Sequence, residues 1–259
     1  QFFTYSGLFY SMITFDNIHK SFGANNVLCG VDLIVDRGQS MVIIGGSGTG
    51  KSVLIKTVLG LVTPDNGKIF VNKQDMIHAK RDNFLSKFGM LFQGGALFDS
   101  MPVWQNVAFR LQRGHLKLPK TEAREIAIEK LRRVGLAPDV ADRLPAELSG
   151  GMQKRVSLAR AIAADPEIIF FDEPTTGLDP IMARVINDLI RKIVVEMGAT
   201  AITITHDMTS VATIADKVAM LHDGVIKWCG TLDDMAHSGN SHVDQFIHGR
   251  AEGPIKTLR

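Results

Sequence analysis

The most constraining feature of the sequence is the stretch GGSGTGKS at residues 45–52, which directly follows the apolar run Ser40–Ile44. A run of this kind predicts a short buried strand, and the pattern after Gly50 predicts a helix that ends at Gly60. Between the two, small residues allow successive backbone N–H groups to turn inward and surround phosphate oxygens. The helix presents the positive end of its dipole to the same point. The pattern therefore predicts an α/β fold with a phosphate-binding loop between a strand and a helix.

This loop offers a cation and a metal ligand in addition to its backbone donors. Lys51 is expected to reach the β- and γ-phosphates of a nucleotide as a point charge, and the Ser52 hydroxyl is expected to bind Mg²⁺. The other interpretation is a glycine-rich turn beside a surface lysine. The predicted nucleotide-binding residues of the loop are Gly45, Gly46, Ser47, Gly48, Thr49, Gly50, Lys51, Ser52 and Val53.

A second apolar run ends in two adjacent carboxylates, since residues 168–174 read IIFFDEP. Side chains alternate along a strand, so Asp172 and Glu173 cannot do the same job. We expect Asp172 to hold Mg²⁺ through water and Glu173 to act as the general base toward an attacking water molecule. An acidic strand end that faces solvent is the alternative.

A third apolar run, residues 199–205, ends at His206. Strands of a parallel sheet end on the same side, so His206 is predicted to meet the γ-phosphate close to Glu173. A single histidine in such a position is more often structural, and the pattern does not decide between the two roles.

Residues 148–155 read LSGGMQKR at the start of a predicted helix. Ser149 is expected to cap this helix, while Gly150 and Gly151 expose its first amides and form a second anion site. The alternative is a serine-capped helix with a flexible start. Taken with GGSGTGKS and IIFFDEP, this stretch resembles LSGGQ, the signature of the ATP-binding cassette (ABC) family.

The resemblance implies a fold, cofactors and an assembly. The family fold is α/β, a P-loop NTPase (RecA-like) core with an N-terminal antiparallel β subdomain and an inserted α-helical subdomain. Family members hydrolyse ATP with Mg²⁺ as head-to-tail homodimers, in which the signature of one subunit closes over ATP in the phosphate loop of the other. The residues implied for contact across the dimer are Ser149, Gly150 and Gly151. Those implied for catalysis are Lys51, Gln93, Glu173 and His206, and those implied for Mg²⁺ are Ser52, Gln93 and Asp172.

Three more positions match elements of the family. Gln93 follows the apolar strand predicted at residues 90–92 and resembles the Q-loop glutamine, which joins the Mg²⁺ site to the helical lobe. Asp179, within GLDP, resembles the D-loop aspartate at the dimer seam. Phe22 has the usual position of the aromatic residue that stacks on adenine, although a core aromatic that closes a hairpin is the alternative. Departures from the commonest family residues, none of which removes a catalytic group, are Gly46, Val53 and Met152.

The remaining pattern alternates strands and helices around a helical middle, which predicts a parallel, doubly wound sheet with an inserted lobe. The other predicted strands are residues 12–22, 31–35, 68–72 and 218–222. The other predicted helices are residues 181–197 and 209–215, with a helical middle at 103–164 in which Thr121 and Ser149 cap runs ending at Val134 and Ala164. The predicted domains are an N-terminal appendage at 1–11, an ATPase domain at 12–235 with its helical lobe at about 95–164, and a weakly patterned C-terminal tail at 236–259.

Composition limits the classes of partner. The 259 residues include 29 Lys and Arg against 27 Asp and Glu, a net charge of +2, so no nucleic-acid partner is expected. The two cysteines, Cys29 and Cys229, fit neither a disulfide framework nor zinc-ligand spacing. No apolar stretch reaches the roughly 18–20 residues needed to cross a bilayer. Residues 1–11 carry no charge and several aromatics, and a membrane-surface anchor is the alternative to the predicted appendage.

An ATPase of this family that has no membrane span must act on a separate permease. Residues 94–104, GGALFDSMPVW, place apolar side chains in a loop-like region, where their exposure is costly. These side chains predict a groove for a permease helix, and packing on the core of the helical lobe is an equally supported alternative. The apolar residues concerned are Ala96, Leu97, Phe98, Met101, Val103 and Trp104.

Within the family, the stretches GGSGTGKSV, FQGGALFDSM and DEPTTGLDPIM resemble the ATPases of Mla-type phospholipid transport systems in Gram-negative bacteria. This resemblance implies a role in outer-membrane lipid asymmetry, a peripheral place on the cytoplasmic side of the inner membrane, and only indirect contact with phospholipid. It also implies a small regulatory subunit with a sulfate-transporter/anti-sigma-antagonist (STAS) fold and a periplasmic lipid-binding protein. The alternatives are the ATPase of another importer or exporter with a small-molecule cargo, and a soluble regulatory ABC ATPase. The tail residues expected to be solvated are His237, His242 and His248.

Overall fold

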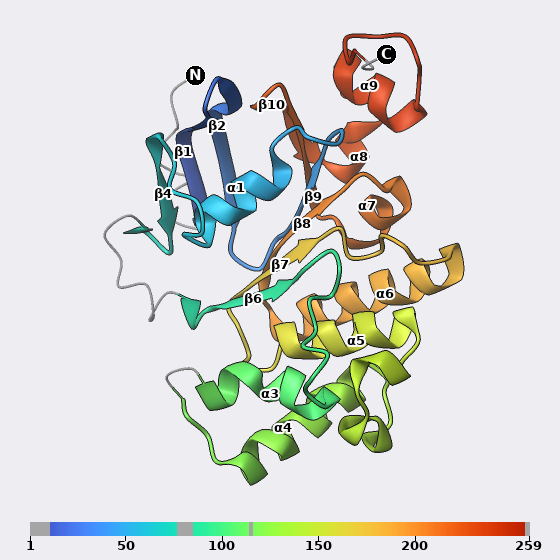
Figure 1. Ribbon diagram of the computed structural model, residues 1–259. Helices are drawn as coiled ribbons and strands as arrows, with labels where there is room; N and C mark the ends of the chain where they lie inside the picture. The colour runs from blue at the N-terminus through green and yellow to red at the C-terminus, as the bar shows by residue number, and fades with distance from the viewer. Residues whose placement is uncertain (1–10, 77–84, 114–115, 257–259) are drawn as a thin grey trace. The chain divides into compact units, whose positions relative to one another are not determined.

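The computed structural model describes residues 11–76, 85–113 and 116–256 (Figure 1). The chain divides into two compact units, the first formed by Gln1–Ala79 with Ile204–Arg259 and the second by Lys80–Thr203. The appendage predicted at residues 1–11 lies outside the described residues except for Ser11. Within the described ranges, none of the helices has the length and apolar character that crossing a bilayer requires.

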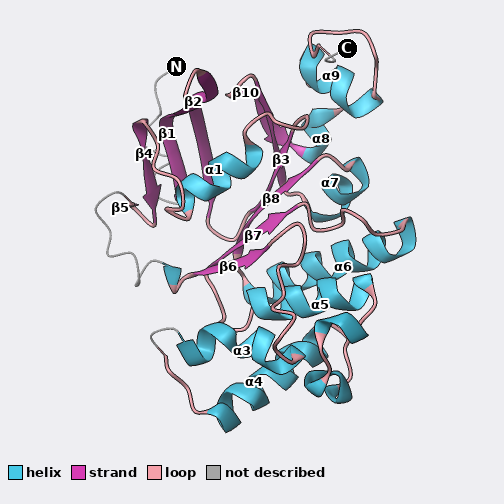
Figure 2. Ribbon diagram, in the orientation of Figure 1, coloured by secondary structure: helices cyan, strands magenta, loops and turns pink. Residues whose placement is uncertain are grey.

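The first unit contains a four-stranded antiparallel sheet, shown in magenta in Figure 2. Its strands, in the order β2-β1-β4-β5, are β1 (Ser11–Phe22), β2 (Asn25–Asp36), β4 (Asn66–Val71) and β5 (Gln74–Asp75). The predicted β hairpin at the start of the chain is confirmed. Its second strand is longer than residues 31–35, because Asn25 and Asn26 already pair with the end of β1. Alternate apolar side chains of β2, Val31, Leu33 and Val35, are buried as period-two patterning requires.

The phosphate-loop strand belongs to a second set of strands in the same unit, in the order β10-β9-β3. Here β3 (Ser40–Ile44) is parallel to β9 (Lys217–His222), which is antiparallel to β10 (Val225–Thr231). All five residues of β3 are buried, as expected for a parallel strand covered on both faces. The helices of this unit are α1 (Lys51–Val58), α7 (Met208–Ile214), α8 (Leu232–Met235) and α9 (Ser241–His248).

The C-terminal tail is more ordered than its sequence pattern indicated. Asn240 caps α9 by accepting hydrogen bonds from the backbone of His242 (3.0 Å) and Val243 (3.2 Å), and Val243 is fully buried. The prediction of solvated histidines is wrong for His242, whose half-buried ring lies 5.3 Å from the ring of His222. Burial, followed by the neighbouring His222 and Lys227, lowers the pKa of His242. The spacing of the histidines alone could not reveal this contact, because His222 is distant in sequence.

The second unit holds the helical middle together with three strands in the order β8-β7-β6. The strands are β6 (Phe88–Leu91), β7 (Ile168–Asp172) and β8 (Thr200–Thr205), and β6 and β7 are parallel. The predicted helical middle is confirmed, and Figure 1 shows α3, α4 and α5 packed on one another. The helices are α3 (Val103–Arg113), α4 (Lys120–Arg133), α5 (Gly150–Ala161) and α6 (Pro180–Met197), with 3₁₀ turns η2 (Pro138–Asp142) and η3 (Pro145–Glu147).

Two helix limits in this unit differ from the prediction. Thr121 does not cap α4, because the helix begins at Lys120 and Pro119 holds the N-cap position with no side-chain hydrogen bond. Helix α5 ends at Ala161 rather than Ala164. The chain turns at Asp165, which has a positive φ of 45° and precedes Pro166. A residue before proline disfavours helical backbone, so the chain leaves the helix before this point.

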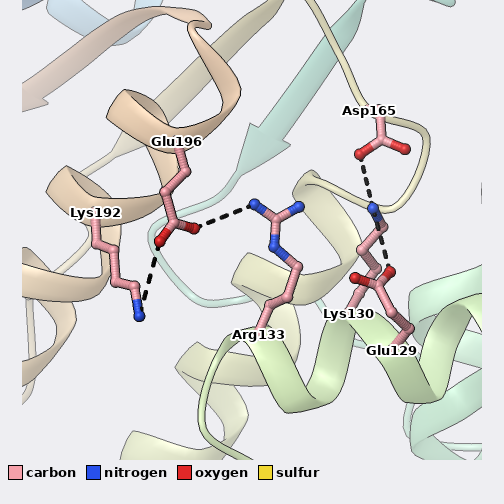
Figure 3. A network of polar contacts seen from close by, with 6 residues as sticks. All are labelled: Glu129, Lys130, Arg133, Asp165, Lys192 and Glu196. Carbon is pink, nitrogen blue, oxygen red and sulfur yellow. Dashed lines mark hydrogen bonds and ion pairs between the residues drawn. The ribbon is translucent and has the colours of Figure 1, made fainter.

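Ion pairs connect the helices of the second unit. Figure 3 shows six charged residues from α4, α6 and the turn after α5: Glu129, Lys130, Arg133, Asp165, Lys192 and Glu196. The Lys130 ammonium is almost completely buried and lies 2.7 Å from Asp165, so it joins α4 to that turn. Arg133 lies 3.5 Å from Glu196 and joins α4 to α6. The pair with Glu196 is largely exposed and contributes little to stability, whereas the buried Lys130 depends on its carboxylate partners.

A glycine allows β6 to approach α5, and its replacement gives a first testable prediction. A Cβ built on Gly89 would lie 2.2 Å from the backbone oxygen of Ala161, so the strand or the helix would have to shift. We expect Gly89→Ala to lower the free energy of unfolding by about 1–3 kcal/mol, the usual cost of overpacking. Urea denaturation measures this change. The matched control is Gly94→Ala, which meets no atom within 4 Å. Equal stability of the two variants would show that this approach is not tight.

Candidate functional site

In the first unit, the phosphate loop joins β3 to α1 with a sharply bent backbone. Gly50 occupies the N-cap position of α1 with φ 98°, and no side chain caps the helix. A Cβ on Gly45 would lie 2.3 Å from the backbone oxygen of Leu221, and one on Gly50 would lie 2.9 Å from that of Val27. Glycine is therefore required at both positions. Because the N-cap residue Gly50 has no side chain, it offers no acceptor to the first backbone amides of α1. These amides are therefore suited to donate hydrogen bonds to an anion.

Lys51 is folded over this loop. Its side chain is only 8% exposed, and the ammonium group donates hydrogen bonds to the backbone oxygens of Gly45 (2.8 Å) and Gly46 (2.7 Å). The Thr49 hydroxyl also donates to Gly46, at 3.0 Å. Neutral carbonyls are weaker partners for an ammonium group than phosphate oxygens are. The loop therefore already holds its cation where an arriving phosphate can compete for it.

His206 follows the end of β8 and is exposed. The next residue, Asp207, caps α7 and accepts hydrogen bonds from the backbone of Thr209 (3.1 Å) and Ser210 (3.0 Å) and from the Ser210 hydroxyl (2.6 Å). Burial raises the pKa of Asp207, but these hydrogen bonds outweigh burial and hold the pKa below its usual value. The ionised cap fixes the turn and thereby the backbone at His206.

Phe22 ends β1 at the hairpin turn, with its side chain 50% exposed. Its ring lies under the ammonium group of Lys20, 5.4 Å from the ring centroid. The alternative of a core aromatic is therefore excluded. Stacking on adenine requires an open face of the Phe22 ring, and this role stays a prediction.

In the second unit, Asp172 ends β7 and Glu173 follows it in an unusual backbone conformation. Glu173 has a positive φ of 47°, which is uncommon for a residue with a side chain. The Thr176 hydroxyl lies 3.4 Å from the Glu173 carboxylate, and the Thr176 amide donates to the Glu173 backbone oxygen. The turn after Glu173 thus holds the strained conformation. Strain of this kind is concentrated at functional sites in proteins.

The signature stretch starts α5 as predicted. The Ser149 hydroxyl accepts a hydrogen bond from the backbone of Met152 at 3.3 Å, which confirms Ser149 as the helix cap. Gly150 is exposed, and Gly151 packs against Met182, whose Cε would lie 2.4 Å from an added Cβ. The start of α5 therefore carries its dipole end at the surface, with no side chain on either glycine to obstruct an anion.

Asp179 has a clear local role in this structure. Its carboxylate caps α6 and accepts hydrogen bonds from the backbone of Ile181 and Met182, both at 3.0 Å. The side chains of Asp179 and Ile181 are exposed. This capping role does not test whether Asp179 lies at a dimer seam, which stays a prediction.

Gln93 lies after β6 and is exposed. The apolar segment that follows is packed on the core of the helical lobe in part, and the groove for a permease helix stays a prediction. Val103 and Trp104 are buried in the helical lobe, whereas Phe98 is 40% exposed. The Phe98 ring lies against Phe109, with 4.6 Å between ring centroids. Ala96 is also exposed, and Leu97 and Met101 are half-buried, so only Val103 and Trp104 of the six apolar residues belong to the core.

Sequence reasoning missed the residues that hold this segment in place. Asn106, which is fully buried on α3, accepts a hydrogen bond from the Phe98 backbone at 2.7 Å and donates to the Met101 backbone oxygen at 2.9 Å. Lys154 and Arg160 on α5 donate to the backbone of the segment from its other side. The available signals were an asparagine between apolar residues of α3 and the basic residues Lys154 and Arg160, six positions apart on α5.

The site residues fall into two groups. The first unit carries Phe22, His206 and the phosphate loop, residues 45–53, and the second unit carries the remaining ones. Those in the second unit are Gln93, Ser149, Gly150, Gly151, Asp172, Glu173 and Asp179. The roles of these residues in nucleotide binding and catalysis remain predictions. Their union into one nucleotide site remains a prediction.

Residues 28–176 match the sequence profile described as ABC transporter. The chain belongs to this family. It is accordingly an ATPase, and the family to which it belongs binds ATP. The family was the one that the signature and the two loops had indicated.

Comparisons with individual proteins extend over nearly the whole chain. It is 39% identical over 246 residues to "Probable ribonucleotide transport ATP-binding protein mkl" of Mycobacterium tuberculosis (strain ATCC 25618 / H37Rv), covering 94% of this chain and 68% of the relative. It is 37% identical over 249 residues to "Intermembrane phospholipid transport system ATP-binding protein MlaF" of Haemophilus influenzae, covering 95% and 94%. The dimeric post-hydrolysis structure of the ATP-binding cassette MJ0796, bound to ADP and Pi, has a TM-score of 0.76 and 30% identity, covering 85% of this chain and 99% of that one. The expected cassette fold is thereby confirmed.

Proposed function

We propose that this chain is the ATP-hydrolysing subunit of an Mla-type system, which drives phospholipid transport through a separate permease and maintains outer-membrane lipid asymmetry. The observation that carries this proposal is the likeness to the Haemophilus influenzae phospholipid transport protein, which covers 94% of that relative as well as 95% of this chain. The match therefore includes almost everything that the relative uses for its task. Phospholipid is the cargo of the complex and meets this subunit only indirectly.

A second cargo has a specific observation in its favour. The mycobacterial relatives, at 39% identity, are named for probable ribonucleotide transport. This chain covers 68% of their length, so about a third of each relative has no counterpart in the match. The phospholipid assignment is preferred because its relative matches end to end.

The residues of the site fit a magnesium nucleotide. In the phosphate loop, glycines at positions where a Cβ would collide with the backbone surround the start of α1, and Lys51 adds a buried positive charge. This cradle suits a polyphosphate chain. The proposed metal ligands are a hydroxyl, an amide oxygen and a carboxylate, on Ser52, Gln93 and Asp172. Hard oxygen donors of this kind suit Mg²⁺, which would neutralise charge on the phosphates when bound.

The chemical roles follow from the residue types. Lys51 binds the β- and γ-phosphates, and Glu173 accepts the proton of the attacking water. His206 contacts the γ-phosphate, and Gln93 joins or leaves the Mg²⁺ site as the γ-phosphate binds or departs. Phe22 stacks on adenine. These assignments place the whole reaction in the ATPase domain at residues 12–235, with residues 95–164 as the lobe that transmits it.

Two copies of the chain complete the site in this proposal. The amides at the start of α5, with Ser149, Gly150 and Gly151, bind the nucleotide that the phosphate loop of the partner copy holds. Asp179 lies at the seam between the copies. Support comes from the exposed cap of α5, where the positive end of the helix dipole is open to solvent, and from the dimeric form of the related cassette MJ0796. A regulatory subunit with a STAS fold and a periplasmic lipid-binding protein are further partners within the proposal.

The permease is proposed to contact the segment after Gln93. Phe98, in this segment, is 40% exposed, and Phe92, just before Gln93, is 39% exposed. Hydrogen bonds of the buried Asn106 on α3 with the Phe98 and Met101 backbone hold the segment in place. Exposed aromatic side chains on a supported segment are suited to receive an apolar helix. This contact would hold the subunit at the cytoplasmic side of the inner membrane.

The test uses the native complex, purified from membranes through a tag on this chain and reconstituted in vesicles of phosphatidylethanolamine and phosphatidylglycerol. We expect MgATP to drive transfer of a fluorescent phospholipid and Glu173→Gln to abolish it. Phospholipid should also stimulate hydrolysis in detergent. Stimulation by a ribonucleotide monophosphate such as AMP, without any lipid transfer, would support the second cargo and contradict the first.

A further inference from the structure

One face of α5 holds the chain segment that follows β6. Lys154, Ser157 and Arg160 are three residues apart along α5 and therefore lie on the same side of the helix. The Lys154 ammonium donates a hydrogen bond to the backbone oxygen of Gln93. Arg160 donates to the backbone oxygens of Gly95 (2.6 Å) and Ala96 (2.7 Å). Two cations of one helix thus hold residues 93–96 at the backbone carbonyls of Gln93, Gly95 and Ala96.

The backbone of the segment is shaped for this contact. Gly95 and Ala96 have positive φ values of 76° and 49°. A Cβ on Gly95 would lie 2.9 Å from the Ser157 hydroxyl, which itself lies 3.1 Å from the Gly95 backbone oxygen. The segment therefore approaches α5 as closely as its atoms allow. Hydrogen bonds from charged donors are the stronger kind, and here both donors are largely withdrawn from water.

Lys154 also carries a charge toward the end of β7. Its side chain is 7% exposed. Burial lowers the pKa of Lys154, and the carboxylates of Asp172 and Glu173 act in the opposite direction. The ammonium group is therefore bonded to the Gln93 backbone and is attracted by the two carboxylates. Removal of this buried charge would leave the Gln93 carbonyl without its charged donor and the carboxylates without its attraction.

We propose that Lys154 is a positioning residue, which fixes Gln93 relative to the signature helix α5 through its hydrogen bond to the Gln93 backbone. With Arg160 it makes residues 93–96 a rigid extension of α5. When a partner displaces the exposed Phe98, residues 93–96 and α5 then move together, and the movement includes Ser149 at the start of α5. This inference rests on the roles proposed above for Gln93 and Glu173.

The experiment compares Lys154→Met, which keeps the apolar stem and removes the charged donor, with Lys154→Arg, which retains both charge and donor. The matched control is Lys192→Met, on the exposed face of α6. We expect Lys154→Met to lower kcat for MgATP by about 10- to 100-fold through misplacement of the reacting groups. KM should stay within about twofold, because the phosphate loop is unchanged. Lys154→Arg should recover kcat to within about threefold, and Lys192→Met should match the unaltered chain.

A second measurement does not depend on ATP hydrolysis and detects the hydrogen bond from Lys154 to the Gln93 backbone, which we call the tie. The Gly95 amide bonds to the Phe92 backbone oxygen at 2.9 Å, and the Phe98 amide bonds to Asn106 at 2.7 Å. Loss of the tie should speed hydrogen exchange of the Gly95 amide at least about tenfold in Lys154→Met, and Lys154→Arg should restore slow exchange. The Phe98 amide, held by α3, serves as an internal reference in the same spectrum.

The outcomes separate this inference from the proposed function. Unchanged exchange at Gly95 together with unchanged kcat in Lys154→Met would overturn the inference. The inference would also be overturned if Lys154→Met lowered thermal stability and raised KM together and Lys154→Arg restored neither. Lys154 would then be only a packing residue. If the unaltered chain with its partners hydrolysed no ATP, the proposed function would fail, and exchange at Gly95 would still decide whether the tie exists.

Discussion

Replacement of Glu173 by glutamine is expected to lower steady-state ATP hydrolysis by about 10²- to 10⁴-fold, the usual contribution of a positioned general base. Glutamine has the same size and can still accept the contact from Thr176, but it cannot take a proton from water. Nucleotide binding should survive because the phosphate loop is untouched. ATP-bound dimers should therefore accumulate. Phosphate release measures the rate, and light scattering after size-exclusion chromatography detects the dimers.

The matched control for this variant is Glu167→Gln, which lies just before β7, at the end of the strand opposite Glu173. Glu167 lies 3.7 Å from Lys87 in a partly exposed pair, so its neutralisation should cost little stability. We expect hydrolysis by Glu167→Gln to equal that of the unaltered chain. Hydrolysis retained in Glu173→Gln would overturn the assignment of the base.

Replacement of Lys51 by methionine is expected to weaken MgATP binding by about 10- to 100-fold, because a charged hydrogen bond contributes about 1.5–3 kcal/mol. Methionine fills the buried space of the lysine stem but leaves the backbone oxygens of Gly45 and Gly46 without the ammonium group. Hydrolysis should be lost with it, since the charge also stabilises the transferring phosphoryl group. Titration with a fluorescent ATP analogue measures the affinity.

Lys56→Met is the control for this second prediction. Lys56 lies on the same helix, α1, but is exposed in its last turn. Its replacement changes the net charge of the chain equally without affecting the loop. Equal affinities for the two variants would mean that Lys51 does not meet the phosphates.

The local parts of the site could be predicted from the sequence because their chemistry is continuous along the chain. The loop at residues 45–52 needs only its neighbouring strand and helix, and Ser149 caps α5 within its own turn. Phe22 shows the limit of such reasoning. Its pattern fitted both a buried and an exposed aromatic, and only the hairpin geometry left half of the side chain in solvent.

The parts that sequence reasoning missed depend on contacts between distant segments. Lys154 is 61 residues from Gln93, and no local periodicity relates the two. His242 is likewise partly covered by the ring of His222 on β9, which is distant in sequence. Such contacts form only when the helices and strands pack. They account for the errors in the tail, where α9 had been expected to be a weakly patterned segment.

The central claim is that the phosphate loop of one copy and the signature of another enclose each nucleotide. Ser149→Asp tests it well, because aspartate still caps α5 but places a negative charge where a phosphate should bind. Neither Ser149→Asp nor Lys51→Met alone should hydrolyse ATP, since every site in either homodimer is damaged.

The decisive measurement is the ATPase rate of an equimolar mixture of these two variants, coexpressed so that their copies assort. In the mixed dimer, the intact loop of the Ser149→Asp copy faces the intact signature of the Lys51→Met copy. Because half of randomly assorted dimers are mixed and each has one complete site, we expect recovery of up to about a quarter of the unaltered rate. A mixture as inactive as its two parents, with mixed dimers verified by mass spectrometry, would contradict the shared site.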